Sequence, residues 1–298
     1  LNPYSARLSD LFYRARTPDP SIVLIAIDDA TTEVYGWPIE RIHTIDCDLG
    51  VSGASAAERS PLEEVLRRFL DGGGRVVDSS PMYGRAEAVV GEALASLGHR
   101  AVPFLASKVW TTGRSAGEAQ MRESMRRLRA ERLDLLQVHN LLDWETHLPL
   151  LRDWTATGRL RYVGVTHYSP GAFALMERLL RTERLDFVQL PYSLATREAE
   201  RRLLPAAAET GTAVLVMRPF EEGGLFRAVR DKPLPGWAAE LGCDAWSQVF
   251  LKFILSHPAV TCVIPATANP EHLSENLRAG LGPLPDEAMR RRMAALLR

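Results

Sequence analysis

Polar residues of several chemical types end a series of short apolar runs in this sequence. Val76 and Val77 lead into Asp78, a turn containing Tyr83 follows, and later apolar runs lead into Lys108 and His139. A tyrosine phenol, with a pKa of about 10, is a poor proton donor near neutral pH. A lysine ammonium about 4 Å away, at an effective dielectric near 20, would lower that pKa by about three. With an aspartate to hold the lysine and a neutral histidine to bind a carbonyl oxygen, such a set could protonate that oxygen as a hydride reaches its carbon.

Seven strand-like runs carry these residues and are expected to position them. They cover residues 75–80, 102–110, 133–140, 161–168, 186–193, 212–220 and 260–267. Each is rich in β-branched or other apolar residues without alternation, as in parallel strands that are buried on both faces. The pattern therefore predicts a largely parallel sheet.

The segments between the runs have helical spacing and recognisable start signals. Ser60, Pro61 and Glu63 form a capping box that predicts a helix beginning at Pro61. Ser169-Pro170 and Asn269-Pro270 repeat the signal of a cap followed by proline. Seven or eight βα units over about 240 residues favour a closed (β/α)8 barrel of the TIM type, an α/β fold. An open doubly wound sheet is the alternative, although no GxGxxG motif follows any strand.

A barrel would bring the carboxyl ends of all strands into one ring, where barrel enzymes carry their catalytic residues. In chain order these ends hold Asp78, Lys108, His139, Thr166 with His167, Gln189, Arg218 and Thr267. Each residue taken singly also has a structural explanation, such as a turn cap for Asp78 or a core position for His139. Their coincidence at strand ends favours a common site.

Bulk properties exclude several other classes of function. The formal net charge is −1, so the chain has no charge excess with which to bind nucleic acid. Cys47, Cys243 and Cys262 lie far apart and support neither a disulfide framework nor a metal site. The longest apolar run, at residues 22–27, is too short to span a membrane. We expect a cytoplasmic protein, with export open if the true amino terminus is missing, and no prediction of oligomeric state follows.

Six stretches of the chain resemble the aldo-keto reductases, in order and at suitable spacing, from about residue 60 to residue 298. These stretches are GGGRVVDSSPMYGRAEAVVGEAL, FLASKVW, LLQVHN, YVGVTHY, DFVQLPYS and IPATANPEHLSENL. The resemblance implies an NAD(P)H-dependent reductase of small aldehydes or ketones on a (β/α)8 barrel. It also implies Tyr83 as the general acid, Lys108 lowering the pKa of Tyr83, Asp78 paired with Lys108, and His139 orienting the carbonyl.

The same resemblance implies a set of positions that bind NADPH or NADH. The set comprises Thr166, His167, Gln189, Met217, Arg218, Phe220, Gly223, Thr267, His272, Glu275 and Asn276. Met217 stands where the family commonly has an aromatic ring. Ala266 replaces a lysine that meets the adenosine 2′-phosphate, and His272 replaces an arginine. Because phosphate recognition depends on charge-assisted bonds, the choice between NADPH and NADH stays open.

The amino-terminal segment, residues 1–50, is atypical beside the aldo-keto reductase-like barrel of residues 51–298. Residues 8–41 resemble the start of a CHASE-type extracellular sensor domain but are too few to form a core of their own. A barrel that lacks a strand would expose two edges. We therefore hypothesise that residues 22–27 donate the first barrel strand; the alternative is that residues 1–50 pack poorly.

Two rival functions remain alongside carbonyl reduction. One is a lyase or aldolase barrel in which Lys108 forms a Schiff base. The other is a catalytically impaired nucleotide-binding or interaction scaffold on the same barrel, since fold alone does not fix function.

Overall fold

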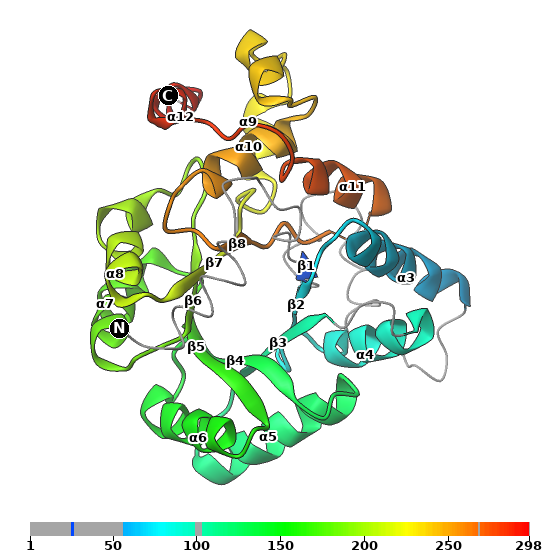
Figure 1. Ribbon diagram of the computed structural model, residues 1–298, viewed down its shortest axis with the longest axis vertical. Coiled ribbons are helices and arrows are strands. Elements are labelled where there is room, and N and C mark those ends of the chain that lie inside the picture. The colour runs from blue at the N-terminus through cyan, green and yellow to red at the C-terminus, as the bar shows by residue number, and fades with distance from the viewer. Residues whose placement is uncertain (1–24, 27–55, 99–102, 268, 298) are drawn as a thin grey trace.

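Eight parallel strands, in sequence order, form the sheet of this α/β protein. The structure, a computed structural model, describes residues 25–26, 56–98, 103–267 and 269–297. The strands are β1 (Ile25–Ala26), β2 (Val76–Asp78), β3 (Phe104–Val109), β4 (Leu133–His139), β5 (Leu160–Thr166), β6 (Phe187–Pro191), β7 (Ala213–Met217) and β8 (Cys262–Val263). Figure 1 shows them as an inner ring, with the helices outside, which is the arrangement of a (β/α)8 barrel.

The helices follow the strands in alternation. The α-helices are α3 (Ala56–Asp71), α4 (Ala86–Leu97), α5 (Arg114–Arg127), α6 (Trp144–Ala156), α7 (Phe173–Thr182), α8 (Leu203–Thr210), α9 (Gly224–Val229), α10 (Trp246–Leu255), α11 (Pro270–Arg278) and α12 (Glu287–Ala294). Within the described residues, 3-10 helices cover Pro170–Ala172, Glu198–Arg201 and Gly236–Leu241. The seven strands predicted from apolar runs are confirmed, each within the predicted range to a residue or so.

The first strand of the barrel comes from the amino-terminal segment. Ile25 and Ala26 pair in parallel with Val77 and Asp78 of β2. The rest of residues 1–50, including nearly all of the stretch 8–41 and Cys47, lies outside the described residues. The two described residues of this segment therefore extend the sheet beside Asp78.

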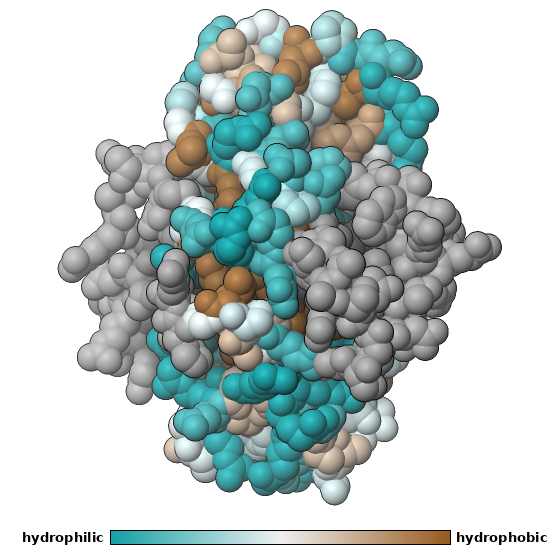
Figure 2. Space-filling view, turned by 90° about the vertical axis from the view of Figure 1, so that its right-hand side faces the viewer, coloured by the Kyte–Doolittle hydropathy of each residue, from teal (hydrophilic) through white to brown (hydrophobic). Residues whose placement is uncertain are grey.

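Apolar side chains divide into two cores because successive residues of a strand point to opposite faces. The smaller core fills the barrel; its members include Val76, Ala106, Leu135, Phe187 and Leu215. The larger core lies between the strands and the surrounding helices. On the face drawn in Figure 2, hydrophilic residues cover much of the described surface, and hydrophobic ones gather in patches toward its centre and top.

Two of the three predicted helix starts are correct. Asn269 caps α11 by accepting hydrogen bonds from the backbone N–H groups of Glu271 and His272. Ser169 caps the 3-10 helix that begins at Pro170. The third prediction is wrong, because α3 begins at Ala56 and runs through Pro61. Pro61 is the sixth residue of α3, beyond the first turn, where a proline removes one intrahelical hydrogen bond; Ala56, Ala57, Glu58 and Arg59 before it all favour helix.

Two further classes of feature are absent from the part of the chain that the structure describes. Within those ranges, no helix is long and apolar enough to cross a membrane. The same ranges contain no group of three or more His, Cys, Asp or Glu side chains arranged to hold a metal ion.

Candidate active site

Strand alternation places polar side chains inside the barrel, directly above its apolar filling. Asp78 follows Val76 by two residues and Lys108 follows Ala106 by two, and both apolar residues belong to the interior core. The registers of β2, β3 and β4 then set these polar residues side by side, with Lys108 opposite Gln137. The carboxyl ends of the strands therefore carry one contiguous polar layer.

A buried ion pair lies at the centre of this layer. Lys108 Nζ donates hydrogen bonds to Asp78 Oδ2 at 2.5 Å and to the backbone oxygen of Ser79 at 2.9 Å. The Lys108 and Asp78 side chains are only 1% and 0% exposed, respectively. Charges so far from water are tolerated only when they are paired and hydrogen-bonded. Each partner thus depends on the other for its place in the fold.

Two glutamine side chains complete the surroundings of Asp78. Gln189 Nε2 donates to Asp78 Oδ2 at 3.3 Å, and Gln137 Nε2 lies 3.4 Å from Asp78 Oδ1. Gln137 Nε2 also donates to Gln189 Oε1 at 2.9 Å. Gly164 makes room for this arrangement, since a Cβ there would come within 3.1 Å of Gln137 Cγ. Gln137 was not predicted from sequence, although its position two residues before His139 puts it on the same face of β4.

Tyr83 lies close to both Lys108 and His139. Lys108 Nζ is 5.1 Å from the centroid of the Tyr83 ring. The rings of Tyr83 and His139 meet edge to face, with centroids 5.7 Å apart and an angle of 89°. The structure therefore brings together all four residues, Asp78, Tyr83, Lys108 and His139, that the strand ends and the β2–α4 turn supply.

The imidazole of His139 is buried and neutral. Burial, with a smaller contribution from the positive charge of Lys108, lowers the pKa of His139 to about 3. Its Nδ1 atom lies 2.9 Å from Ser80 Oγ, in the turn after β2. A neutral imidazole carries a single N–H, so this residue can donate one hydrogen bond but cannot supply a proton near neutral pH.

The expected cofactor residues at the ends of β5 and β6 differ in how many of their side-chain polar groups are already hydrogen-bonded within the protein. Thr166 is fully buried, and its Oγ1 has no hydrogen-bond partner among the described residues. His167 is partly exposed, its Nδ1 accepts a hydrogen bond from the Ser169 backbone, and its ring stacks on Tyr168 at 5.1 Å. Gln189, by contrast, uses its amide group on Asp78 and Gln137. Of these three residues, Thr166 is therefore the one that retains an open buried hydroxyl.

The segment after β7 is held in unusual backbone conformations. Arg218, Glu221, Glu222 and Gly223 all have positive φ, between 51° and 79°. Arg218 forms an ion pair with Glu222, while its buried Nε has no partner among the described residues. Backbone strain of this kind gathers at ligand sites.

Two other expected residues of this segment lie at different depths. Met217 ends β7 and is partly buried. Phe220 is buried, and its ring packs against Phe226 at 4.9 Å. The Phe220 side chain thus belongs to the core, which leaves its backbone for contacts with a ligand.

The remaining expected cofactor residues lie on the β8–α11 segment. Thr267 Oγ1 accepts a hydrogen bond from the backbone of Asn269 at 3.1 Å, and Asn276 Nδ2 donates to the oxygen of Pro265 at 3.3 Å. Glu275 accepts a hydrogen bond from Ser247 Oγ. His272 lies in the first turn of α11. These side chains brace the segment, and their polar groups are partly committed to it.

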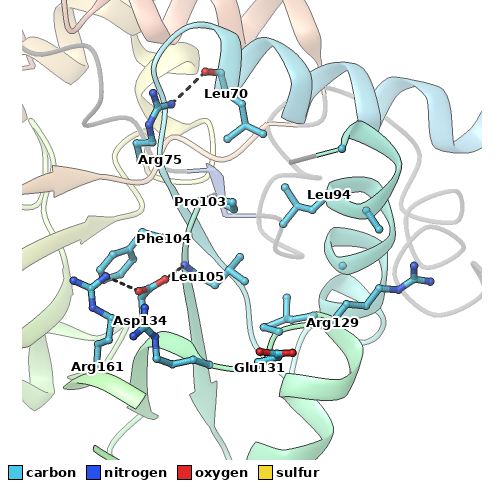
Figure 3. A pocket seen from close by; sticks show the side chains of 16 residues that line it. Leu70, Arg75, Leu94, Pro103, Phe104, Leu105, Arg129, Glu131, Asp134 and Arg161 are labelled. Atoms are coloured by element: carbon cyan, nitrogen blue, oxygen red, sulfur yellow. Dashed lines mark hydrogen bonds and ion pairs between the residues drawn. The ribbon is translucent and has the colours of Figure 1, made fainter. Parts of the chain in front are cut away.

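A cavity of about 880 Å³ lies at the other end of the strands, near the starts of β3, β4 and β5. Leu70, Leu94 and Leu105 are among its apolar lining residues, and Asp134 and Arg161 are among its polar ones (Figure 3). Asp134 accepts hydrogen bonds from the Leu105 backbone and from Arg161, both at 2.9 Å. None of its lining residues is an expected catalytic or cofactor residue.

Comparisons with known proteins agree with the geometry of the strand ends. The family model of the Aldo/keto reductase family matches residues 50–296. Methylglyoxal reductase YeaE of Escherichia coli (strain K12) is 29% identical over 231 residues, which cover 75% of this chain and 80% of that protein. Aldo-keto reductase YhdN of Bacillus subtilis (strain 168) is 30% identical over 168 residues, about half of each chain.

A solved structure of an aldo/keto reductase has the same fold as this chain. The crystal structure of an aldo/keto reductase from Klebsiella pneumoniae, in complex with NADP and acetate, superposes with a TM-score of 0.72 at 25% identity. The superposition covers 96% of this chain and 93% of the Klebsiella pneumoniae chain. The resemblance of residues 8–41 to a sensor domain has no support from these relatives.

Proposed function

The chain belongs to the aldo/keto reductase family, and we propose that Asp78, Tyr83, Lys108 and His139 are its catalytic residues. As an oxidoreductase of this family, it reduces aldehydes or ketones to alcohols by hydride transfer from NADPH or NADH. The observation that carries the assignment of residues is the buried Lys108, paired with Asp78 and facing the Tyr83 ring, with His139 beside that ring.

In this proposal Tyr83 donates a proton to the carbonyl oxygen. As the phenol gives up its proton, negative charge develops on its oxygen, and the ammonium of Lys108 stabilises that charge. Lys108 Nζ lies 5.1 Å from the centroid of the Tyr83 ring, and two unit charges about 5 Å apart interact by about 3 kcal/mol at an effective dielectric near 20. Asp78 keeps Lys108 charged and fixed, and the amides of Gln137 and Gln189 hold Asp78 in turn. His139 donates a hydrogen bond to the same carbonyl oxygen and orients it.

The residues at the strand ends fit a nicotinamide cofactor. The buried Thr166 hydroxyl needs a partner, and the strained turn after β7, where Arg218 Nε has no recorded partner among the described residues, offers N–H donors for a pyrophosphate. When bound, the reduced nicotinamide supplies the hydride. We assign Thr166 and His167 to its carboxamide and the thioether of Met217 to its ring. We assign the pyrophosphate to Arg218, Gly223 and the backbone of Phe220. We assign the adenosine part of the cofactor to Thr267, His272, Glu275 and Asn276.

Two features of the site suggest departures from the family. Gln189 uses its amide to hold Asp78, so we assign it to positioning the ion pair, and a carboxamide contact would require it to turn. Ala266 offers no charge to a 2′-phosphate, and His272 is a weaker cation than arginine. We therefore expect NADH to be used about as well as NADPH.

An isotope-transfer experiment tests the function. The protein is incubated with NADPH or NADH carrying deuterium at the transferable position, with methylglyoxal or 4-nitrobenzaldehyde as the carbonyl compound. The proposal predicts one alcohol formed for each cofactor oxidised, with deuterium on the former carbonyl carbon. A folded protein that binds the cofactor and yields no labelled alcohol from either compound would instead fit a nucleotide-binding scaffold.

A further inference from the structure

Ser80 contacts the imidazole of His139 from the turn that follows β2. Its Oγ lies 2.9 Å from His139 Nδ1 and also accepts a hydrogen bond from the Met82 backbone N–H at 3.2 Å. The Ser80 side chain is fully buried, and His139 is only 6% exposed. Water is therefore a poor substitute for either of these two contacts.

The donors and acceptors around Ser80 Oγ favour one arrangement of protons on the Ser80 hydroxyl and the His139 ring. A hydroxyl has one proton to donate and lone pairs with which to accept. Because Ser80 Oγ accepts from Met82, its own proton is left to donate, and His139 Nδ1 is the one acceptor recorded for it within the described ranges. Donation to Nδ1 requires that Nδ1 carries no proton, so the single proton of the neutral ring lies on Nε2.

The opposite arrangement leaves a donor without a partner. If Nδ1 carried the proton and donated to Ser80 Oγ, that oxygen would accept two hydrogen bonds and its own O–H would have no recorded acceptor among the described residues. A buried donor without a partner is costly, and such groups are rare in folded proteins. The Nε2–H form is therefore the more stable one.

We propose that Ser80 is a positioning residue that holds His139 in the Nε2–H tautomer, so that this N–H is the group offered to the substrate carbonyl. The inference rests on the proposed function, because only a carbonyl substrate gives the Nε2–H its use. No protein partner of Nε2 is recorded in the described part of the chain, and the Tyr83 and Trp110 rings flank the imidazole at 5.7 and 6.5 Å.

The same contact also selects the orientation of the ring. Turning the imidazole by half a turn about its Cβ–Cγ bond would replace Nδ1 with a carbon next to Ser80 Oγ. The hydroxyl would then lose its acceptor, and a carbon would stand in place of Nε2 at the mouth of the barrel. Ser80 thus fixes both which nitrogen faces outward and whether that nitrogen carries a proton.

Nitrogen NMR of the protein without substrate tests the proposal directly. Histidine labelled with ¹⁵N is introduced into the full chain, and the His139 signals are identified as those missing from His139→Asn. The expected spectrum has a protonated Nε2 and an unprotonated Nδ1 in the wild type, with protonated Nδ1 increasing in Ser80→Ala. A wild-type His139 protonated at Nδ1, or a ratio unchanged in Ser80→Ala, would overturn the proposal. This readout needs no turnover, so it fails independently of the reductase function.

Kinetics then separate positioning from a structural role. Ser80→Ala is expected to lower kcat about tenfold, less than the roughly hundredfold that follows complete loss of a donor to the reacting oxygen. The KM for NADPH should not change, and Ser80→Thr, which keeps a hydroxyl, should recover most of the rate. Ser169→Ala is the matched control, since it removes the same kind of turn hydrogen bond, from the Gly171 N–H to Ser169 Oγ. Ser169 reaches His167 through its backbone N–H, which the substitution keeps, and its side chain has no recorded histidine contact within the described ranges. Equal losses of kcat in Ser80→Ala and Ser169→Ala would overturn the assignment.

Discussion

Both ends of the barrel carry polar side chains that are partly or fully buried, but they differ in how far these side chains are paired within the described part of the chain. At the amino-terminal ends, Asp134 accepts from the Leu105 backbone and from Arg161, and Asp186 accepts from the Val163 backbone at 2.9 Å. At the carboxyl ends, Ser79 Oγ, Gln137 Oε1 and Thr166 Oγ1 are buried without a partner among the described residues. Since native proteins rarely leave such groups unpaired, the difference identifies the end built to receive ligands.

The two ends also differ in what their ion pairs contribute. Asp134 and Arg161 have side chains 13% and 36% exposed, so their attraction is screened and adds little to stability. Asp78 and Lys108 are almost completely buried, and each would be left as an uncompensated charge without the other. One pair connects neighbouring strands, whereas in the proposed mechanism the other keeps a charge beside the Tyr83 ring.

Breaking the buried pair should give the largest effects. Lys108→Met is expected to reduce the free energy of unfolding by about 3–5 kcal/mol, because Asp78 is left charged and buried. It should also lower kcat/KM by about 10²–10⁴-fold, because the proton donor loses its supporting charge. Denaturant unfolding and steady-state kinetics measure the two losses.

The double variant Asp78→Asn with Lys108→Met sharpens this test. With neither charge present, stability should return to within about 1–2 kcal/mol of the wild type, while activity stays lost. Recovery of activity together with stability would mean that the pair only supports the fold.

Removing residues 1–50 tests whether the carboxyl-end site needs β1. Ala26 pairs with Asp78, so the deletion uncovers the edge of β2 beside the ion pair. We expect a broader thermal transition and a melting temperature lower by about 5 °C or more, together with reduced kcat. Deletion of residues 1–20, which keeps Ile25 and Ala26, is the control. A 1–50 deletion as soluble and as cooperatively folded as the full chain would contradict donation of the first strand.

The low pKa of His139 predicts a pH dependence of stability at the carboxyl end. The folded protein keeps His139 neutral down to about pH 3, whereas the unfolded chain takes up a proton near its ordinary pKa of 6.5. Unfolding thus binds a proton in this window, and stability falls as pH falls, by about 2 kcal/mol between pH 6.5 and 5. His139→Asn should flatten this part of the curve. An unchanged slope in the variant would place the effect on other histidines.

A change at the amino-terminal end should have the smallest effect and spare activity. Asp134→Ala removes the acceptor for the Leu105 N–H and the partner of Arg161, so we expect a loss of about 1–2 kcal/mol in the free energy of unfolding. Asp134→Asn, which keeps an acceptor oxygen, should lose less. In both variants kcat should stay within about twofold of the wild type. A tenfold loss of kcat would contradict the assignment of catalysis to the carboxyl end alone.

Sequence reasoning predicted the strands well and the contacts between side chains less well. Continuous apolar runs and the polar residues that end them are local signals, so Asp78, Lys108 and His139 could be located before the fold was known. Gln137 was missed because it lies inside an apolar run, and Ser80 because a serine in a turn usually serves the turn. The contact of Gln189 with Asp78 and the inward ring of Phe220 depend on side-chain packing across distant strands. The start of α3 was misplaced because a cap followed by proline also occurs inside a helix.

Removing one phenolic oxygen at each end of the barrel tests the central claim most directly. Tyr83 lies beside Lys108 at the carboxyl end, and Tyr162, whose OH accepts a weak hydrogen bond from Arg161, lies toward the amino-terminal end. The measurement is kcat/KM for NADPH-dependent reduction of 4-nitrobenzaldehyde by Tyr83→Phe and Tyr162→Phe. We predict a loss of about 10²–10⁴-fold in Tyr83→Phe with an unchanged melting temperature, and less than about twofold in Tyr162→Phe. Full activity in Tyr83→Phe, or equal losses in the two variants, would contradict the assignment of the carboxyl end as the catalytic one.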